Sequence, residues 1–318
     1  MSIPVALIGC GRWGSELVDA VNSHRHLNLK VVADSDTHVL SLAAALAPQA
    51  ELVPTLTDAL SHDVEAAIIA TPSATHAALA REALEAGLDV LVEKPLALEA
   101  SDAKELCTLA YDGKRIAMVG HVLRYHPCYE RLIALVRGGV LGQLRHLGCI
   151  RLTQSGSPDP LWTLAPHDLA TLVALDSSDV DTLDLETNAT HGDETVTKLH
   201  VRLESGVTAA LTLSTTAKHP ERLTRAEGED GTLGFDELDP RGAVNFAPPG
   251  GEPQALPCEV SETCHPSDAL CRELDHFAEC VWRRVAPRTS FAHALKVVDI
   301  IERAQAPQKP SRRGKRRR

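Results

Sequence analysis

Short apolar runs alternate with helical patterns along the first third of the chain. From length and β-branched content, we predict buried strands at 5–8, 29–33, 65–70, 89–92 and 116–119. We predict helices, from the spacing of apolar residues, at 15–23, 39–46, 74–85 and 100–110, with Gly87 just past the third of them. This alternation predicts an α/β domain with a doubly wound parallel sheet over residues 1–120.

The pattern changes after Gly120. Residues 197–203 and 207–213 alternate apolar and polar side chains around a short turn, which predicts an antiparallel hairpin with one apolar face. Helical patterns return at 267–284 and 292–304. We therefore expect a C-terminal α+β domain over 121–305, with a mostly antiparallel, open-faced sheet, and a basic disordered tail over 306–318. The free sheet face predicts a homodimer or homotetramer.

Composition and charge narrow the class of protein. The 318 residues are 44% hydrophobic, enough for two cores, yet no apolar run reaches the length of a membrane span. With no signal-peptide pattern, we expect a cytoplasmic protein with no membrane contact. Seven basic residues lie in 309–318, which leaves 25 basic against 43 acidic residues elsewhere. Because an acidic body repels nucleic acid, we expect none to bind; attachment through the tail is the alternative.

The eight cysteines contain no C-x-x-C pair, which argues against a zinc ribbon or a disulfide framework. Cys258, Cys264, His265 and Cys271 are the one group that would suit a metal, but their spacing matches no familiar site. We expect no metal.

A glycine-rich motif, GCGRWG at 9–14, follows the first predicted strand and precedes the first predicted helix. In that context Gly9, Gly11 and Gly14 allow the backbone to approach a pyrophosphate at the helix N-terminus, with Arg12 and Trp13 in the same loop. The motif predicts an N-terminal Rossmann domain that binds a dinucleotide.

Asp34 lies twenty residues beyond Gly14, at the end of the second predicted strand. A carboxylate there accepts hydrogen bonds from the adenosine ribose and repels a 2′-phosphate, so NAD is favoured and NADP is the less favoured cofactor. Asp36 is an alternative for this role. The alternative for the whole site is an accidental glycine turn with Asp34 as a helix cap.

A second motif, EKP at 93–95, follows the strand at 89–92 and so emerges at the carboxyl edge of the sheet, where ligands bind. Lys94 is placed to hold a substrate hydroxyl, to stabilise its negative charge or to relay its proton. A surface salt bridge of Glu93 is the alternative.

Together these motifs resemble the glucose-fructose oxidoreductase, inositol dehydrogenase and rhizopine-catabolism (Gfo/Idh/MocA) oxidoreductase family over nearly the whole chain. The matching stretches are GCGRWG, VVADSD, ATPSATHAALAREALEAGLDVLVEKPLA, VGHVLRYHP, GVLGQLRHL, LWTLAPHDLATL, EGEDGTLGFDEL and CRELDHFAECV. The stretch that ends in EKP is the most specific, because it joins a helix, a strand and a lysine in one pattern.

The resemblance implies roles for the matching residues. The family's EKP lysine is catalytic and its glutamate touches the nicotinamide ribose, which implies these roles for Lys94 and Glu93, and the Lys94–Pro95 peptide is a candidate cis bond. The family's T-P dipeptide and following histidine match Thr71, Pro72 and His76, which we expect to line the cofactor cleft. A packed histidine is the alternative for His76.

The stretch LWTLAPHD at 161–168 resembles the family's second catalytic motif and implies that His167 is the general base. Helix capping beside Asp168 is the alternative. Inositol dehydrogenases have an aspartate four residues earlier, where this chain has Thr163, which can hydrogen-bond to His167 but cannot stabilise an imidazolium. This difference favours a nucleotide-linked amino sugar over a polyol. Trp162 is a further candidate for the substrate cleft.

His121, Arg124 and Tyr125 follow the last strand of the first domain and, by resemblance, lie at the mouth of the cleft. Arg124 is a candidate contact for substrate or cofactor phosphate, with surface salt-bridging as the alternative. Packing at the domain junction is the alternative for His121 and Tyr125.

The sequence thus predicts an NAD-dependent dehydrogenase that acts on a CH–OH group of a sugar, with nucleotide-linked sugars included. Two alternatives stay open. One is a non-catalytic NAD-binding regulator of the same fold, and the other is a polyol or inositol dehydrogenase.

Overall fold

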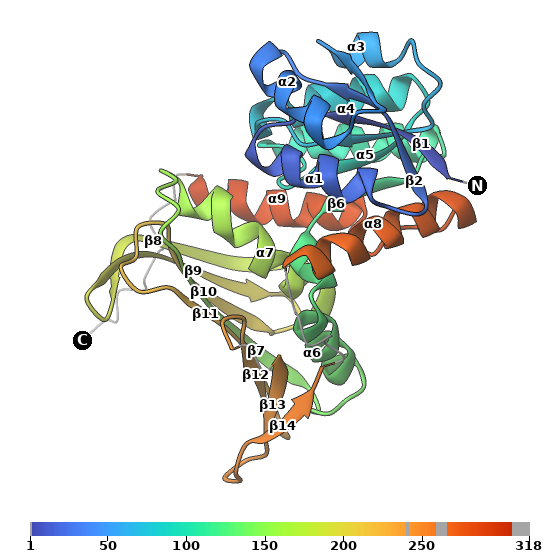
Figure 1. Ribbon diagram of the computed structural model, residues 1–318. Coiled ribbons are helices and arrows are strands. Elements are labelled where there is room, and N and C mark those ends of the chain that lie inside the picture. Colours follow the sequence, from blue (N-terminus) through green and yellow to red (C-terminus); the bar gives the residue numbers. More distant parts are fainter. Residues whose placement is uncertain (1, 240–241, 259–265, 307–318) are drawn as a thin grey trace.

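The computed structural model describes residues 2–239, 242–258 and 266–306, arranged around two sheets (Figure 1). Six parallel strands form the N-terminal sheet in the order β3-β2-β1-β4-β5-β6. Their bounds are β1 (Ile3–Ile8), β2 (Leu27–Ala33), β3 (Glu51–Val53), β4 (Ala66–Ile69), β5 (Asp89–Glu93) and β6 (Ala117–Gly120). The predicted doubly wound sheet is confirmed; only the short edge strand β3 carried too little pattern to be predicted.

Helices cover both faces of this sheet, which is why its strands are apolar without alternation. Along β1, Val5 and Leu7 pack with one group of helices, whereas Ala6 and Ile8 pack with the other. The helices of this region are α1 (Arg12–Asn22), α2 (Thr37–Leu46), α3 (Leu56–Ala59), η1 (Ser73–Thr75), α4 (His76–Glu85) and α5 (Ala100–Asp112). Gly87 has φ +84°, the left-handed conformation expected just past a helix end.

The second sheet has eight strands in the order β14-β13-β12-β11-β7-β10-β9-β8. All neighbouring pairs are antiparallel except β10 and β7, so the expected mostly antiparallel sheet is confirmed. The strand bounds are β7 (Leu144–Leu152), β8 (Val180–His191), β9 (Glu194–Leu203), β10 (Thr208–Ser214), β11 (Glu221–Gly228), β12 (Gly231–Asp236), β13 (Ala243–Ala247) and β14 (Gln254–Pro257). The predicted hairpin is β9 and β10, with Val201 opposite Ala209.

Helices cover one face of this second sheet and leave the other open (Figure 1). The covering elements are η2 (Val122–Tyr125), α6 (Pro127–Arg137), α7 (Pro160–Leu175) and α9 (Phe291–Gln305). On β9, Leu199 and Val201 are buried beneath them, whereas His200 and Arg202 are exposed on the open face. The period-two pattern therefore identified the sheet face that meets water.

The last two helices return to the first sheet. Helix α8 (Pro266–Arg283) places Leu274 and Phe277 in the core beside Leu17 of α1. Helix α9 lies between the two sheets and contributes to both cores, Val298 to the first and Ile301 to the second. The predicted second domain, residues 121–305, includes both helices, because an apolar stripe shows that a helix packs but not against which surface.

Candidate active site

A cavity of about 510 Å³ lies between the two sheets, at the carboxyl ends of β4 and β5. Both parts of the chain contribute to its wall. The polar and aromatic lining residues are Trp13, Thr71, Ser73, His76, Glu93 and Lys94 from the first part, and Arg151, Thr153, His167, Arg222 and Glu237 from the second. The carboxyl edge of a doubly wound sheet is where ligands bind in such folds.

The glycine loop forms the turn between β1 and α1. Gly9 has φ +90°, and a Cβ on it would come within 2.7 Å of Thr71. A Cβ on Gly14 would overlap the carbonyl oxygen of Gly9. A Cβ on Gly11, by contrast, would have no atom of the protein within 4 Å. Helix α1 begins with Gly11 as its N-cap, so the unpaired N–H groups of its first turn face this open space. The loop therefore fits a dinucleotide diphosphate.

Asp34 is fixed directly beside this loop. Its Oδ2 accepts a hydrogen bond from the backbone N–H of Cys10 at 2.8 Å, and its Oδ1 accepts one from Asp36 at 2.9 Å. The remaining lone pairs of the carboxylate are available to a ribose diol. Asp36, the alternative residue, caps α2 through the N–H groups of His38 and Val39.

Glu93 is buried at the end of β5, where Gly120 of β6 leaves room for its carboxylate. Burial raises the pKa of Glu93 to about 7, while the neighbouring ammonium of Lys94 favours the charged form. The indole Nε1 of Trp13 and the Oε1 of Glu93 are both buried but are not in hydrogen-bond geometry. A buried donor and a buried acceptor without partners on the wall of one cavity fit a polar ligand group, as expected for a nicotinamide ribose.

Lys94 links the two parts of the chain. Its Nζ donates to the backbone carbonyl of Thr163 on α7 at 3.1 Å. Burial lowers the pKa of Lys94, and Glu93 opposes that shift. The Lys94–Pro95 peptide is cis, as the resemblance suggested. An ammonium held at a cavity wall with donors to spare is suited to bind the oxygen of an alcohol or ketone.

His167 reaches the same cavity from helix α7. Burial lowers the pKa of His167 well below its ordinary value, and Lys94, Arg151, His121 and Arg222 add to the shift. The imidazole is therefore neutral at physiological pH, the form in which a histidine accepts a proton. Its Nδ1 is buried without a hydrogen-bond partner among the described residues.

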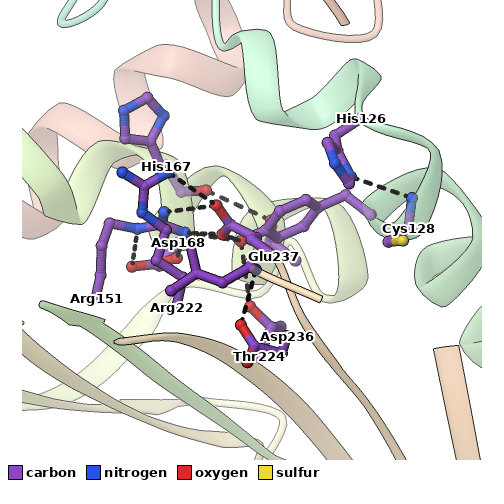
Figure 2. Close-up of polar contacts among 12 residues, drawn as sticks. His126, Cys128, Arg151, His167, Asp168, Arg222, Thr224, Asp236 and Glu237 are labelled. Carbon is purple, nitrogen blue, oxygen red and sulfur yellow. Dashed lines mark hydrogen bonds and ion pairs between the residues drawn. The ribbon is translucent and has the colours of Figure 1, made fainter. Parts of the chain in front are cut away.

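A buried ionic network that the sequence did not predict lies beneath His167 (Figure 2). Arg151 of β7 forms a bidentate pair with Asp168, with Nη2 to Oδ1 at 2.7 Å and Nε to Oδ2 at 3.2 Å. The same guanidinium donates to Glu237 and to the hydroxyl of Tyr129. Arg151, Asp168 and Tyr129 come from β7, α7 and α6, and Glu237 directly follows β12, so no local pattern brings them together. Glu237 lay within a matched stretch but had no role assigned to it.

Thr163 and Trp162 of α7 do not make the contacts that the sequence predicted for their side chains. The hydroxyl of Thr163 is hydrogen-bonded to Ser157 at 2.6 Å and not to His167. Trp162 packs against both cores, and its Nε1 donates to Gln305 of α9 at 2.8 Å. Neither side chain lines the cavity. Trp162 points away because residues at neighbouring positions of a helix occupy different faces.

Arg124 and Tyr125 are also outside the lining of the cavity. Tyr125 is buried, with its hydroxyl 3.1 Å from that of Thr289 and Arg288 stacked over its ring, so the packing alternative holds for it. Burial lowers the pKa of Arg124 to about 10. His121 is buried against His293, with ring centroids 5.8 Å apart. The 3₁₀-helix η2 turns these side chains into the domain junction.

Thr71, Pro72 and His76 line the cavity as expected. Both ring nitrogens of His76 are engaged, Nδ1 with the carbonyl oxygen of Pro95 and Nε2 with that of Thr71, each at 2.7 Å. His76 thus connects the turn after β4 with the turn after β5. This geometry supports the packing alternative for its ring within the wall of the cleft.

Within residues 2–239, 242–258 and 266–306, no three His, Cys, Asp or Glu side chains are grouped so as to hold a metal ion. Cys264 and His265 lie outside the described residues, as does the basic stretch 307–318. None of the described helices is both long and apolar enough to cross a bilayer.

A glycine loop with a neighbouring carboxylate, and a cavity that adjoins the loop and contains a lysine and a histidine, characterise an NAD-dependent oxidoreductase. A sequence model of the oxidoreductase family with an NAD-binding Rossmann fold, Gfo/Idh/MocA, matches residues 3–121. The chain is similar to this family over its N-terminal part.

Two curated relatives are similar to this chain. It is 29% identical to UDP-N-acetylglucosamine 3-dehydrogenase of Acidithiobacillus ferrooxidans over 77% of this chain and 81% of that protein. It is 32% identical to inositol 2-dehydrogenase of Corynebacterium glutamicum, but over only 45% of this chain and 43% of that protein. The crystal structure of the Acidithiobacillus enzyme superimposes with a TM-score of 0.84 at 23% identity, over 96% and 97% of the two chains, which shows a common fold.

Proposed function

We propose that this protein is an NAD-dependent dehydrogenase that interconverts a secondary alcohol and a ketone of a sugar, with nucleotide-linked amino sugars among its candidate substrates. One observation carries the proposal: Lys94 and His167, from opposite sides of the domain junction, line one cavity beside the glycine loop. The relatives named above, a nucleotide-sugar dehydrogenase and an inositol dehydrogenase, support this substrate class.

In this proposal the first domain, residues 1–120, holds the cofactor, and the second, residues 121–305, supplies the substrate face. Gly9, Gly11, Arg12, Trp13 and Gly14 surround the diphosphate. Asp34 binds the adenosine ribose. Thr71, Pro72, His76 and Glu93 line the nicotinamide end of the cleft. When bound, NAD supplies the hydride chemistry at its nicotinamide ring.

The chain's own residues handle the oxygen and its proton. Lys94 donates a hydrogen bond to the reacting oxygen and offsets the negative charge that develops as its proton leaves. His167 accepts that proton during oxidation and returns it during reduction, because its neutral imidazole has a free lone pair. Thr163 positions both groups through its backbone carbonyl rather than through its side chain.

The proposal is tested by following NADH formation while a panel of nucleotide sugars, free sugars, sugar acids and polyols is offered with NAD. Turnover of at least one sugar, lost in Lys94→Ala and His167→Asn, supports it. NADH binding without turnover of any compound by the unaltered protein would favour the non-catalytic regulator instead. Turnover of inositol alone would favour the polyol alternative.

We further propose that the protein is a cytoplasmic homodimer or homotetramer that acts on a small molecule and binds neither nucleic acid nor membrane. The open face of the second sheet supports an association between copies. Cys10, Cys107, Cys149 and Cys280 are free thiols, which fits a reducing compartment. Light scattering tests the oligomer, and salt-dependent DNA binding that disappears without residues 311–318 would contradict the expected absence of nucleic-acid binding.

A further inference from the structure

Arg222 is a cation of the cavity wall that the proposed reaction does not use. It lies on β11 directly opposite Arg151 of β7, so the sheet register places two arginines side by side. Figure 2 shows Arg222 reaching toward His167 alongside Arg151. Two like charges at adjacent positions repel each other, so each guanidinium needs negative charge close to it.

The two arginines are satisfied very differently. Arg151 donates through all three of its nitrogens to Asp168, Glu237 and Tyr129. Arg222 has one acidic neighbour, with its Nη1 4.0 Å from the Oε2 of Glu237, which is beyond hydrogen-bond distance. The Nε of Arg222 is buried without a hydrogen-bond partner.

Both carboxylate oxygens of Glu237 already accept hydrogen bonds from residues other than Arg222. Its Oε1 already accepts from Tyr129 at 2.6 Å and from Arg151 at 2.7 Å, and its Oε2 accepts from Arg151 at 3.2 Å. The guanidinium of Arg222 therefore presents unused donors to a cavity that also contains the ammonium of Lys94. A guanidinium fork is matched in geometry to the two oxygens of a carboxylate or a phosphate.

We propose that Arg222 binds an oxyanion of the substrate, a carboxylate or a phosphate attached to the sugar near the reacting carbon. The substrate is then an acidic sugar derivative rather than a neutral polyol. This inference rests on the proposed dehydrogenase function, since it names the substrate class of the same cavity. The bound anion also offsets the positive charges of Lys94, Arg151 and Arg222 that surround His167.

The first experiment measures binding alone. Protein saturated with NADH, so that the cofactor's phosphate site is filled, is titrated with inorganic phosphate in a calorimeter. We expect saturable binding that weakens at least about tenfold in Arg222→Gln and is partly retained in Arg222→Lys. Arg225→Gln is the matched control, because Arg225 is on the same strand, is exposed on the open face and pairs with Glu227. Equal phosphate binding by the unaltered protein and Arg222→Gln, or none by either, would overturn the inference.

The second experiment compares glucose, glucuronate and glucose 1-phosphate, and the matching nucleotide sugars, as substrates with NAD. We expect kcat/KM for the preferred anionic compound to fall at least about tenfold in Arg222→Gln, with no change in Arg225→Gln. Preference for glucuronate identifies a carboxylate, and preference for the phosphate compounds identifies a phosphate. If the neutral sugar is preferred and Arg222→Gln has no effect, the inference fails while the dehydrogenase stands. If no sugar is oxidised but phosphate binding still requires Arg222, the proposed function fails and the anion site stands.

Discussion

The ammonium of Lys94 donates to the backbone carbonyl of Thr163, which connects the end of strand β5 to helix α7. In an α-helix the carbonyl of residue 163 also accepts the N–H of residue 167. A single peptide oxygen thus fixes Lys94 relative to the helical turn that carries His167. This contact explains how two groups 73 positions apart in the sequence face one cavity.

Lys94→Ala should abolish turnover while NADH binding changes by less than about threefold, because Lys94 contacts the reacting oxygen rather than the dinucleotide. NADH fluorescence titration and steady-state kinetics measure the two effects. Lys104→Ala, at an exposed position of α5, is the control and should retain full activity. Full activity in Lys94→Ala would exclude Lys94 from the chemistry.

Gly11→Ala should leave the fold intact but weaken NADH binding at least about tenfold. The space above Gly11 is open in the protein and its φ of −61° suits alanine, so the added methyl group meets only the diphosphate. Gly14→Ala is the contrasting variant, since its methyl group would overlap the Gly9 carbonyl and lower the melting temperature. If Gly11→Ala bound NADH with unchanged affinity, the diphosphate would have to bind away from Gly11.

Asp34→Asn should raise the ratio of NADP to NAD turnover at least about tenfold, because it removes the charge that repels a 2′-phosphate. The asparagine oxygen can still accept the N–H of Cys10, so the loop keeps its shape. Kinetics with both cofactors measure the ratio. The same ratio in both proteins would assign ribose recognition to another residue.

Asp168→Asn should lower the free energy of unfolding by about 3–5 kcal/mol, because it leaves the buried guanidinium of Arg151 with one carboxylate fewer. Urea denaturation measures the change. The exposed pair of Arg145 and Glu229 supplies the control, and Glu229→Gln should cost at most about 1 kcal/mol. A small effect of Asp168→Asn would mean that Glu237 alone suffices for Arg151.

His293 should make the protein less stable in acid. Burial lowers its pKa from 6.5 to about 4, with further lowering by Arg124 and Arg137, while the backbone of Ala170 opposes the shift. Between pH 6.5 and 4 the unfolded chain therefore binds a proton that the folded protein does not. The free energy of unfolding should decrease by up to about 3 kcal/mol as the pH is lowered from 6.5 to 4.

His293→Gln removes this group, so the difference in unfolding free energy between the two proteins should change by that amount between pH 7 and 4. A difference that is independent of pH would show that His293 has an ordinary pKa in the folded state.

Elements and motifs with a local signal could be predicted from the residues alone. The strand at 5–8, the glycine turn, Asp34 and the EKP stretch are each contiguous, and the period of apolar residues separated the two kinds of sheet. The resemblance to the family predicted Lys94 and His167 as the two catalytic residues. Such features are readable because neighbouring residues in sequence are neighbours in the element that they form.

Contacts between separate segments could not be predicted in this way and are known from the folded chain. Helix α8 joins the first core, Trp162 turns toward Gln305, and Thr163 acts through its carbonyl. Arg151 and Arg222 come together because strands β7 and β11 pair in one register. The physical reason is that packing and strand register are set by contacts between distant parts of the chain, and a side chain's partners are fixed only when those parts are folded together.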